Sequence, residues 1–332
     1  MLWLYFASAF KKAEKDFMIS TEFMIFSGSS NLPLAQKIAE RIGISLGQIE
    51  LKRFSDGEIW VKYGENIRGR DIFIVQSTNP PAENIMELLI MLDAARRASA
   101  KRVTAVIPYF GYSRQDRKDQ PRVAITAKLM ANLITEAGAD RVIAMDLHAS
   151  QIQGFFDIPF DHLYGSSVFL NHLSGLSNNL SIVSPDVGGI KIARAYAKML
   201  NSSLIVIDKR RPKQNVAEVM NIIGEVEGKD ILIVDDLIDT AGTFVGAVNA
   251  LKAKGANKIY GAITHPLLSG KAFERLKECE ALEKLFVTDS INIDENNCNK
   301  IKVVSAAGLF AEAIIRTHNN ESISSLFNID KG

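Results

Sequence analysis

The chain has 332 residues, of which 47% are hydrophobic and 23% charged, and its formal net charge at pH 7 is +1. This length and apolar content allow a large buried core, and the length favours two domains of ordinary size. The near-neutral charge argues against a nucleic-acid partner, which would call for a basic domain or stripe, so any anion site must be local. Two cysteines, Cys279 and Cys298, fit neither a disulfide framework nor a metal cluster and favour a reducing compartment, by default the cytoplasm.

The amino-terminal segment is apolar from Leu2 to Phe10 but is not expected to enter a membrane. The run is far shorter than the ~20 residues that span a bilayer. Its lysines follow the apolar run, whereas those of a signal peptide precede it. Met24 stands directly before a strand-like segment, Ile25–Ser27. We therefore expect residues 1–23 to form an extension outside the core fold.

Strand-like and helix-like segments alternate along the rest of the chain. Strand-like runs cover residues 71–76, 103–108, 141–147, 181–184, 204–207, 231–234 and 258–264. Helix-like segments cover residues 83–98, 125–136, 190–200 and 245–254. This alternation predicts an α/β fold of parallel sheets flanked by helices. The pattern breaks near Tyr164–Leu176 and restarts, which predicts two similar α/β domains, residues 24–164 and 165–332.

An aromatic and then highly charged segment, Tyr109–Arg122, follows the buried strand that ends at Pro108. Rings for stacking and cations for phosphate suit a nucleotide. A solvated charged loop is about equally compatible with the composition. The chain contains neither a Walker loop nor a dinucleotide fingerprint, so a nucleotide would bind by another route.

Acidic residues and a histidine gather after the strand that ends near Leu147. In an extended segment, Asp146 and His148 project to the same side, at the strand end where α/β folds place ligands. They could hold a metal ion or a triphosphate, although a lone histidine is more often a hydrogen-bonded structural residue. Mg²⁺ prefers oxygen ligands, so one imidazole beside carboxylates is admissible but not diagnostic.

Two further polar groups follow later strands. Asp186 stands after a strand and before the turn Gly188–Gly189, where it could join a metal site or simply cap a helix. Lys209 and Arg211, two residues apart at another strand end, can face one cleft and neutralise charge on a phosphoryl group in flight. Solvated surface is the alternative for this basic cluster.

The segment from Ile231 to Thr243 carries the most specific pattern. Four buried-type residues predict a strand, the adjacent carboxylates of Asp235 and Asp236 stand at its carboxyl end, and a small-residue loop precedes a helix from Phe244. Backbone N–H groups and threonine hydroxyls of the loop Thr240–Thr243 can cradle a monophosphate at the positive end of that helix. The carboxylates can then accept the hydroxyls of a ribose. An ordinary capped helix is the alternative.

This stretch resembles the phosphoribosyl-pyrophosphate-binding motif of the type I phosphoribosyltransferase fold. With the other motifs in order, the chain from about Met24 to Phe327 resembles the ribose-phosphate pyrophosphokinases, the phosphoribosyl pyrophosphate synthetases, of the phosphate-activated class. The resemblance implies two tandem type I phosphoribosyltransferase-like domains, the second with the sugar-phosphate motif. It also implies an ATP-dependent diphosphotransferase that moves the β,γ-diphosphoryl group of ATP to the 1-hydroxyl of ribose 5-phosphate and releases AMP.

The resemblance also implies roles for individual residues. Lys209 would be the catalytic cation. ATP would be bound by Asp56, Gly57, Glu58, Arg114 and Gln115. Mg²⁺ would be held by His148 and Asp186, with Asp146, Asp157 and Asp161 as further candidates. Ribose 5-phosphate would be bound by Arg211, Asp235, Asp236, Asp239, Thr240, Ala241, Gly242 and Thr243.

Assembly and regulation follow from the same resemblance. The family forms homo-hexamers that phosphate activates and ADP inhibits, and the matching regulatory segment here would include Ser322–Ser325. Three features depart from the family's pattern: Ile192 replaces a basic residue, Pro266–Leu267 replaces a Gly-Val pair, and residues 1–23 are additional.

Two other functions use the same fold. A base-transferring phosphoribosyltransferase would share the sugar socket, but it would leave the Arg114 loop and a second full domain unexplained. A catalytically silent regulatory homologue would keep the fold and lose activity. The residues Arg114, His148, Asp186, Lys209 and Arg211 are all intact, which argues against silence.

Overall fold

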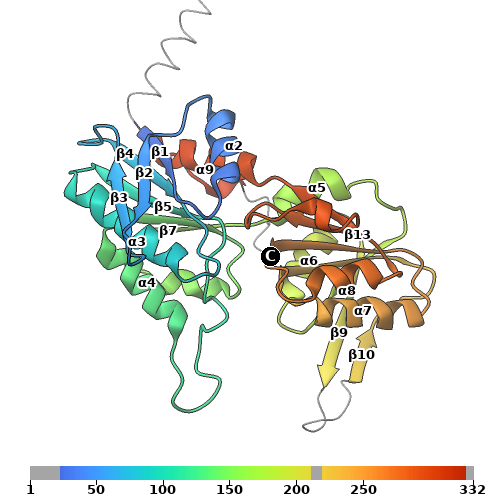
Figure 1. The fold of residues 1–332 in the computed structure, drawn as a ribbon. Coiled ribbons are helices and arrows are strands. Elements are labelled where there is room, and N and C mark those ends of the chain that lie inside the picture. The colour runs from blue at the N-terminus through green and yellow to red at the C-terminus, as the bar shows by residue number, and fades with distance from the viewer. Residues whose placement is uncertain (1–22, 211–218, 327–332) are drawn as a thin grey trace, which may run out of the picture. The chain divides into compact units, whose positions relative to one another are not determined.

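The computed structural model describes residues 23–210 and 219–326. Within them the chain forms two compact units (Figure 1). Of the described residues, unit 1 contains 23–163 together with 307–326, and unit 2 contains Tyr164–Ala306. Each is a largely parallel sheet with helices against it, which confirms the predicted α/β class.

Unit 1 has a five-stranded sheet in the order β1-β4-β5-β6-β7, in which all neighbours are parallel. Its strands are β1 (Phe23–Ser27), β4 (Asp71–Val75), β5 (Arg102–Ile107), β6 (Arg141–Met145) and β7 (Phe160–Leu163). Its helices are α2 (Leu32–Ile42), α3 (Glu83–Arg97), α4 (Thr126–Ala137), the short 3₁₀ helix η1 (Ser150–Phe155) and α9 (Ala307–His318), and the 3₁₀ helix η3 (Ser324–Leu326) follows α9. A separate antiparallel pair consists of β2 (Ile49–Arg53) and β3 (Ile59–Tyr63).

Unit 2 has a seven-stranded sheet in the order β10-β9-β8-β11-β12-β13-β14, parallel except where β10 pairs with β9. Its strands are β8 (Leu180–Ser184), β9 (Ser203–Arg210), β10 (Val219–Ile223), β11 (Asp230–Ile238), β12 (Ile259–Pro266), β13 (Leu282–Thr288) and β14 (Ile301–Val304). Its helices are α5 (Ser166–Leu173), α6 (Ile190–Met199), α7 (Gly242–Ala253), α8 (Ala272–Glu278) and the 3₁₀ helix η2 (Glu295–Asn297). In Figure 1, β9 and β10 extend together beyond the rest of their sheet.

The two units repeat one order of elements. In unit 1 a strand, a helix, an antiparallel pair and a second strand follow one another from β1 to β4, and the same series runs from β8 to β11 in unit 2. The register agrees as well, since Phe23 pairs with Asp71 at the start of β4 and Leu180 pairs with Asp230 at the start of β11. The expectation of two similar α/β halves is therefore confirmed at the level of topology.

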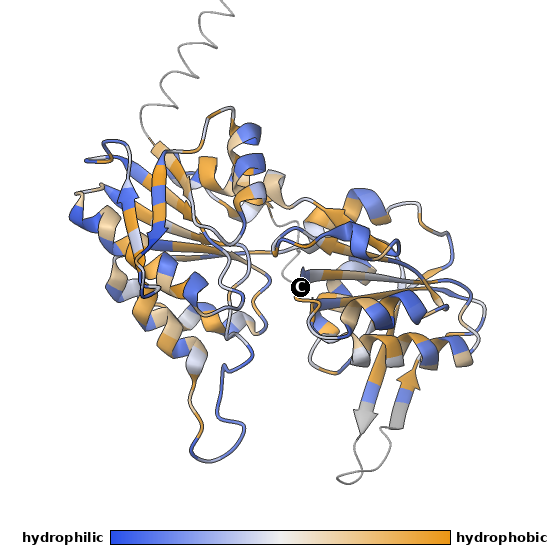
Figure 2. Ribbon diagram, in the orientation of Figure 1, coloured by the Kyte–Doolittle hydropathy of each residue, from blue (hydrophilic) through white to orange (hydrophobic). Residues whose placement is uncertain are grey.

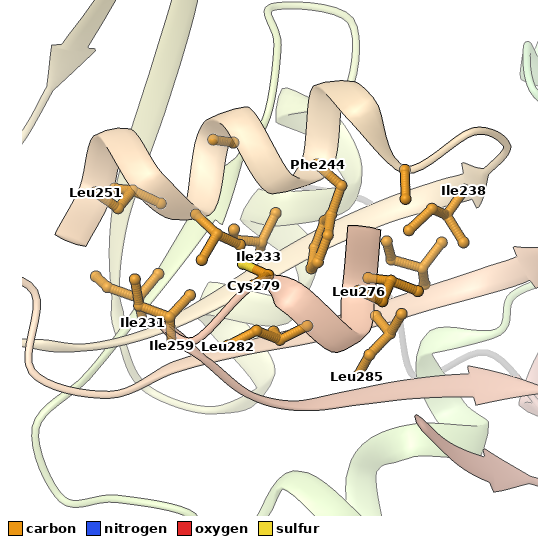
Figure 3. Packing of buried hydrophobic residues seen from close by; sticks show 14 of the residues in the cluster. Ile231, Ile233, Ile238, Phe244, Leu251, Ile259, Leu276, Cys279, Leu282 and Leu285 are labelled. Atoms are coloured by element: carbon orange, nitrogen blue, oxygen red, sulfur yellow. The ribbon is translucent and has the colours of Figure 1, made fainter. Parts of the chain in front are cut away.

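Apolar side chains on the central strands hold the helices of each unit in place. All five residues of β4 are buried, and the strands of both sheets are the most hydrophobic parts of Figure 2. In unit 2, Phe244 of α7 and Leu276 of α8 pack with Ile233 of β11 and Leu285 of β13 in one buried cluster (Figure 3). This cluster fixes the start of α7 against β11, where the predicted sugar-phosphate motif lies.

The carboxyl-terminal helix α9 returns to unit 1, whereas the sequence placed it in the domain of residues 165–332. Arg102 on β5 donates to both carboxylate oxygens of buried Asp71 and to the carbonyl of Thr317 at 3.1 Å. His318 Nδ1 lies 2.9 Å from Asp71 Oδ2, and its ring lies 4.7 Å from that of Phe23. Phe23 is 2% exposed and belongs to β1, so the core starts one residue before the predicted boundary.

None of the helices within residues 23–210 and 219–326 is long and apolar enough to cross a bilayer.

Candidate functional site

The acidic pair Asp235 and Asp236 lies inside β11, so the predicted end of that strand at Val234 was wrong. Backbone pairing with β12 continues through Asp235 to Ile238, while pairing with β8 ends at Ile233. The carboxylates therefore stand on strand backbone that is fixed by β12 on one side and lies beyond its pairing with β8 on the other. Asp236 is buried and Asp235 partly buried, an arrangement that can present carboxylates to sugar hydroxyls in fixed positions.

The loop after β11 ends earlier than predicted, because α7 begins at Gly242. Ala241 precedes it with φ at 60° and ψ at 0°, a left-handed conformation that a non-glycine residue adopts at a cost of about 1 kcal/mol or more. No side chain caps this helix start, and the first N–H groups of a helix have no intrahelical partner. The joint of β11 and α7, the loop between the strand and the helix start, therefore offers backbone N–H donors and the positive end of a helix to an anion.

A concentration of negative charge lies at the carboxyl ends of β8 and β11. Burial raises the pKa of Asp235 well above its ordinary value, and the neighbouring charges of Asp236 and Asp186 raise that pKa further. Asp186 Oδ1 accepts the N–H of Gly189 at 2.9 Å, but Gly189 only precedes α6 and no side chain caps that helix, so the helix-capping alternative is not borne out. The charges of Asp186 and Asp236 nevertheless act on Asp235 in the same unit, although no three His, Cys, Asp or Glu residues within the described part of the chain are grouped closely enough to hold a metal ion.

The equivalent joint of unit 1 lacks these features. Gln76 stands as many residues after Asp71 as Asp235 does after Asp230. Its side chain is fully buried and bonds Ser30 at 2.7 Å and Glu87 at 2.8 Å. The loop that follows contains Pro80 and Pro81, which have no N–H to donate. Of these two joints in the described part of the chain, that of β11 and α7 is the one that combines paired carboxylates with a helix start whose N–H groups no side chain caps.

The predicted catalytic lysine, Lys209, belongs by its backbone to β9, where it pairs with Met220 of β10. The antiparallel partner strand was not predicted from the sequence. Arg211, the predicted ribose 5-phosphate ligand, lies outside the described residues.

In unit 1, the residues Asp56, Gly57 and Glu58 form the exposed turn between β2 and β3. The Asp56 carboxylate accepts the N–H of Glu58 at 3.1 Å, and the N–H of Phe54 bonds the Glu58 carbonyl at 2.9 Å. Gly57 has φ at 98°, a conformation that glycine adopts without strain. Two hydrogen bonds thus define the turn, and its polar groups are exposed.

The predicted nucleotide loop runs from the end of β5 to α4 and extends away from the body of unit 1 (Figure 1). Arg114 and Gln115 are exposed, and the carbonyl of Gln115 accepts the N–H of Ala127 at 3.1 Å. The aromatic surface differs from the prediction, because Tyr109 and Phe110 are only 4% and 3% exposed. These two rings belong to the core and are not available for stacking.

The base of this loop fits closely against the β4–α3 loop at Gly111. The N–H of Gly111 bonds the Thr78 hydroxyl at 2.8 Å, and a Cβ added at Gly111 would overlap the Thr78 carbonyl oxygen. We expect Gly111→Ala to lower the free energy of unfolding by about 1–3 kcal/mol, because backbone must move to make room. Gly154→Ala is the control, since nothing lies within 4 Å of its added Cβ. Urea unfolding curves that coincide for the two variants would contradict this account.

Asp146 and His148 do not share one face of an extended strand, as the sequence had predicted. β6 ends at Met145, and Asp146 has φ at 37°, so the alternation of an extended segment is broken there. Leu147 between them is buried and donates its N–H to His162 Nε2 at 3.1 Å, whereas His148 is exposed. The segment remains at the carboxyl end of β6, at the ligand-binding edge of a parallel sheet.

Two other candidate metal ligands lie next to cations. Asp161, on β7, accepts from Arg141 at 2.6 Å, and this pair is mostly buried. Asp157 is 86% exposed and lies 3.6 Å from Lys128 Nζ. A cation already beside a carboxylate disfavours a second one, so these two positions are poorly suited to a metal ion.

One group at the sugar-phosphate joint was not predicted from the sequence. Arg275 of α8 donates from Nη1 to the carbonyl of Thr240 at 2.7 Å. A single arginine on a short helix gives no motif that a sequence pattern would detect, and 35 residues separate the two partners.

Comparison with known proteins accounts for this combination of sites. Residues 23–138 match the N-terminal domain of ribose phosphate pyrophosphokinase, and residues 201–328 match the phosphoribosyl synthetase-associated domain. A ribose-phosphate pyrophosphokinase of Chlorobaculum tepidum is 59% identical over 93% of this chain and 96% of its own length. One of Fusobacterium nucleatum is 52% identical over 92% and 98% of the respective chains.

A solved structure agrees with these sequence relatives. The phosphoribosylpyrophosphate synthetase of Mycobacterium smegmatis superposes with a TM-score of 0.85 at 38% identity, over 90% of this chain and 99% of that one. Each of these relatives is matched over at least 90% of this chain and of its own length. The chain belongs to the ribose-phosphate pyrophosphokinase family.

Proposed function

We propose that the protein is a ribose-phosphate diphosphokinase that makes 5-phospho-α-D-ribose 1-diphosphate and AMP from ribose 5-phosphate and ATP, feeding nucleotide biosynthesis. The 1-hydroxyl oxygen of the sugar attacks the β-phosphorus of ATP and loses its proton. The bond between that phosphorus and the oxygen that links it to the α-phosphorus breaks, and AMP leaves. The observation that carries the proposal is the joint of β11 and α7, where paired carboxylates precede an uncapped helix start.

The residues of this joint suit one end of that reaction. Backbone N–H groups from Thr240 to Thr243 bind the 5-phosphate, while Asp235 and Asp236 accept ribose hydroxyls and so orient the sugar. Phosphoryl transfer depends mainly on alignment and on neutralisation of charge, and needs little from a strong base. Lys209 supplies positive charge to the transferring group, and Arg211 contacts ribose 5-phosphate.

ATP is assigned to the polar loops of unit 1. The turn Asp56–Glu58 and the exposed pair Arg114 and Gln115 bind the nucleotide. Exposed arginine guanidinium groups match phosphate oxygens in a bidentate way. Tyr109 and Phe110 are buried, so Tyr112, which is 41% exposed, is the ring of this segment that remains available for stacking beside these polar groups.

Mg²⁺ is the proposed cofactor, and its candidate ligands are Asp186 and His148, with Asp146 as a further one. The carboxylate of Asp186 is a hard oxygen donor of the kind that Mg²⁺ prefers, and its charge also raises the pKa of Asp235 in the same unit. When bound, the ion neutralises charge on the polyphosphate.

Regulation and assembly belong to the same proposal. The protein forms a homo-hexamer of the phosphate-activated class that ADP inhibits, and Ser322–Ser325 contribute to the effector pocket. Arg316 Nη1 bonds the carbonyl of Ser322 at 3.0 Å, which fixes the start of that segment on α9. A cytoplasmic location agrees with the buried free thiols of Cys279 and Cys298.

Phosphorus NMR of the purified protein with Mg²⁺, phosphate, ATP and ribose 5-phosphate tests the activity. We expect AMP and a new pyrophosphorylated sugar to appear together, and only when the sugar is present. ADP in place of AMP would indicate a simple kinase. No reaction under these conditions would favour the catalytically silent homologue, and a reaction that requires a free base would favour a phosphoribosyltransferase.

A further inference from the structure

The turn between β12 and α8 runs alongside the sugar-phosphate loop and bonds it at successive residues. The N–H of Leu268 donates to the carbonyl of Ile238 at 3.2 Å, and the N–H of Ser269 donates to the carbonyl of Asp239 at 3.1 Å. The Ser269 hydroxyl also donates to the Asp239 carboxylate. This turn therefore fixes the first part of the sugar-phosphate loop, up to Asp239.

Arg275 continues the same series one residue further. Its Nη1 donates to the Thr240 carbonyl at 2.7 Å, and the same atom lies 3.4 Å from the place where a Cβ on Gly242 would be. The guanidinium is thus beside both neighbours of Ala241, the residue in the left-handed conformation. A strained residue persists only where its surroundings determine its conformation, and Arg275 is the side chain that contacts the carbonyl before it.

The consequence for an anion follows from peptide geometry. The Thr240 carbonyl and the Ala241 N–H belong to one planar trans peptide and point in opposite directions. A hydrogen bond from Arg275 to that carbonyl therefore also fixes the direction of the Ala241 N–H. The positive charge further favours an anion at the first turn of α7.

We propose that Arg275 is a positioning residue for the 5-phosphate of the sugar substrate, acting through the Thr240–Ala241 peptide. This inference rests on the proposed function of the loop. Arg275 holds the peptide in the orientation that presents its N–H to phosphate, so removal of the guanidinium weakens sugar-phosphate binding and leaves the chemistry of diphosphoryl transfer in place.

Steady-state kinetics with each substrate varied in turn test this role. We expect Arg275→Ala to raise KM for ribose 5-phosphate about tenfold, equivalent to about 1.4 kcal/mol, while kcat and KM for ATP change less than about twofold. Arg275→Lys should restore part of the loss, because an ammonium can still donate to the carbonyl and keeps the charge. Lys277→Ala is the matched control, since it removes one charge from the same helix at a position that does not share a face with Arg275.

Isothermal calorimetry of ribose 5-phosphate binding to the same variants separates this inference from the proposed activity. If the wild type releases no AMP, the activity fails while a tenfold weaker Kd in Arg275→Ala still supports the positioning role. Unchanged Kd and KM for ribose 5-phosphate would overturn the role. An equal loss in kcat and in both KM values, without rescue by Arg275→Lys, would overturn it as well, because that pattern indicates general damage to unit 2.

Discussion

Lys209→Ala is expected to lower kcat by about 10²–10³-fold, the usual cost of removing a preorganised group that stabilises developing charge. Negative charge develops on the oxygen between the α- and β-phosphorus as that bond breaks, so a cation placed there contributes more to turnover than to ground-state binding. KM for ATP should therefore change less than about threefold. Coupled assay of AMP release, with ATP and ribose 5-phosphate varied separately, measures both quantities.

Two variants accompany this measurement. Lys254→Ala removes an exposed lysine at the end of α7 and should retain wild-type kinetics. Lys209→Arg keeps the charge but changes its shape and hydration, so we expect partial activity. Turnover that is unchanged in Lys209→Ala would remove Lys209 from the chemical step, and a rise in KM for ATP alone would reassign it to nucleotide binding.

Many of the central strands and of the helices of both units were accessible from sequence because hydrophobic periodicity reports burial. The strand-like run at residues 103–108 corresponds to β5, and the helix-like segment at residues 83–98 corresponds to α3. The end of β11 was missed for a physical reason. Two aspartates read as the end of a buried strand, whereas the backbone of β12 continues to pair beyond them to Ile238.

Features that depend on distant contacts could not be predicted in this way. The return of α9 to unit 1 rests on Arg102 and Asp71 meeting Thr317 and His318, and no local pattern encodes a contact over more than 200 residues. Likewise, the spacing of Asp146 and His148 predicted a shared face only for extended backbone, and the positive φ of Asp146 breaks that condition. The motifs identified candidate residues, but the backbone conformation determines where their side chains lie.

Pro266, one of the departures from the family's pattern, illustrates the same point. It stands at the end of β12 and pairs with Ile238, next to the sugar-phosphate loop. The N–H groups of Leu267 and Leu268 both reach the Ile238 carbonyl, at 3.0 and 3.2 Å. The substitution thus keeps the backbone contacts that hold the loop, which the sequence difference alone does not reveal.

Asp235→Asn is expected to stabilise the substrate-free protein at pH 8 and to impair catalysis. Burial, with the charges of Asp236 and Asp186, raises the pKa of Asp235 above its unfolded value. The folded state therefore holds this proton more tightly, and the stabilisation it gives is present below the unfolded pKa and lost as pH rises through the folded pKa. An amide carries no charge at any of these pH values, so the variant avoids the repulsion that wild type bears at pH 8.

The same substitution should cost activity, because a carboxylate that accepts sugar hydroxyls contributes about 1.5–3 kcal/mol per charged hydrogen bond. That range corresponds to a loss of about 10- to 150-fold in kcat/KM for ribose 5-phosphate. Asparagine retains an oxygen for the N–H of Asp236, which lies 3.0 Å from Asp235 Oδ1, so the strand should remain intact. We expect a gain of a few degrees in Tm at pH 8 that shrinks towards pH 4, since about 1 kcal/mol shifts Tm by about 2–4 °C in domains of this size.

Asp230→Asn, at the other end of β11, is expected to change Tm in the opposite direction. Burial acts to raise the pKa of Asp230, but hydrogen bonds from Ser177, Lys258 and Asn257 outweigh it and lower that pKa. Its stabilisation is present above the unfolded pKa and lost as pH falls through the folded pKa, so this variant should lose Tm at pH 8 and retain activity. Differential scanning calorimetry from pH 4 to 8 separates the two. A drop in Tm for Asp235→Asn at pH 8 would mean that the Asp235 carboxylate stabilises the fold. In that case the acidic pair would not reduce the stability of the protein in exchange for substrate binding.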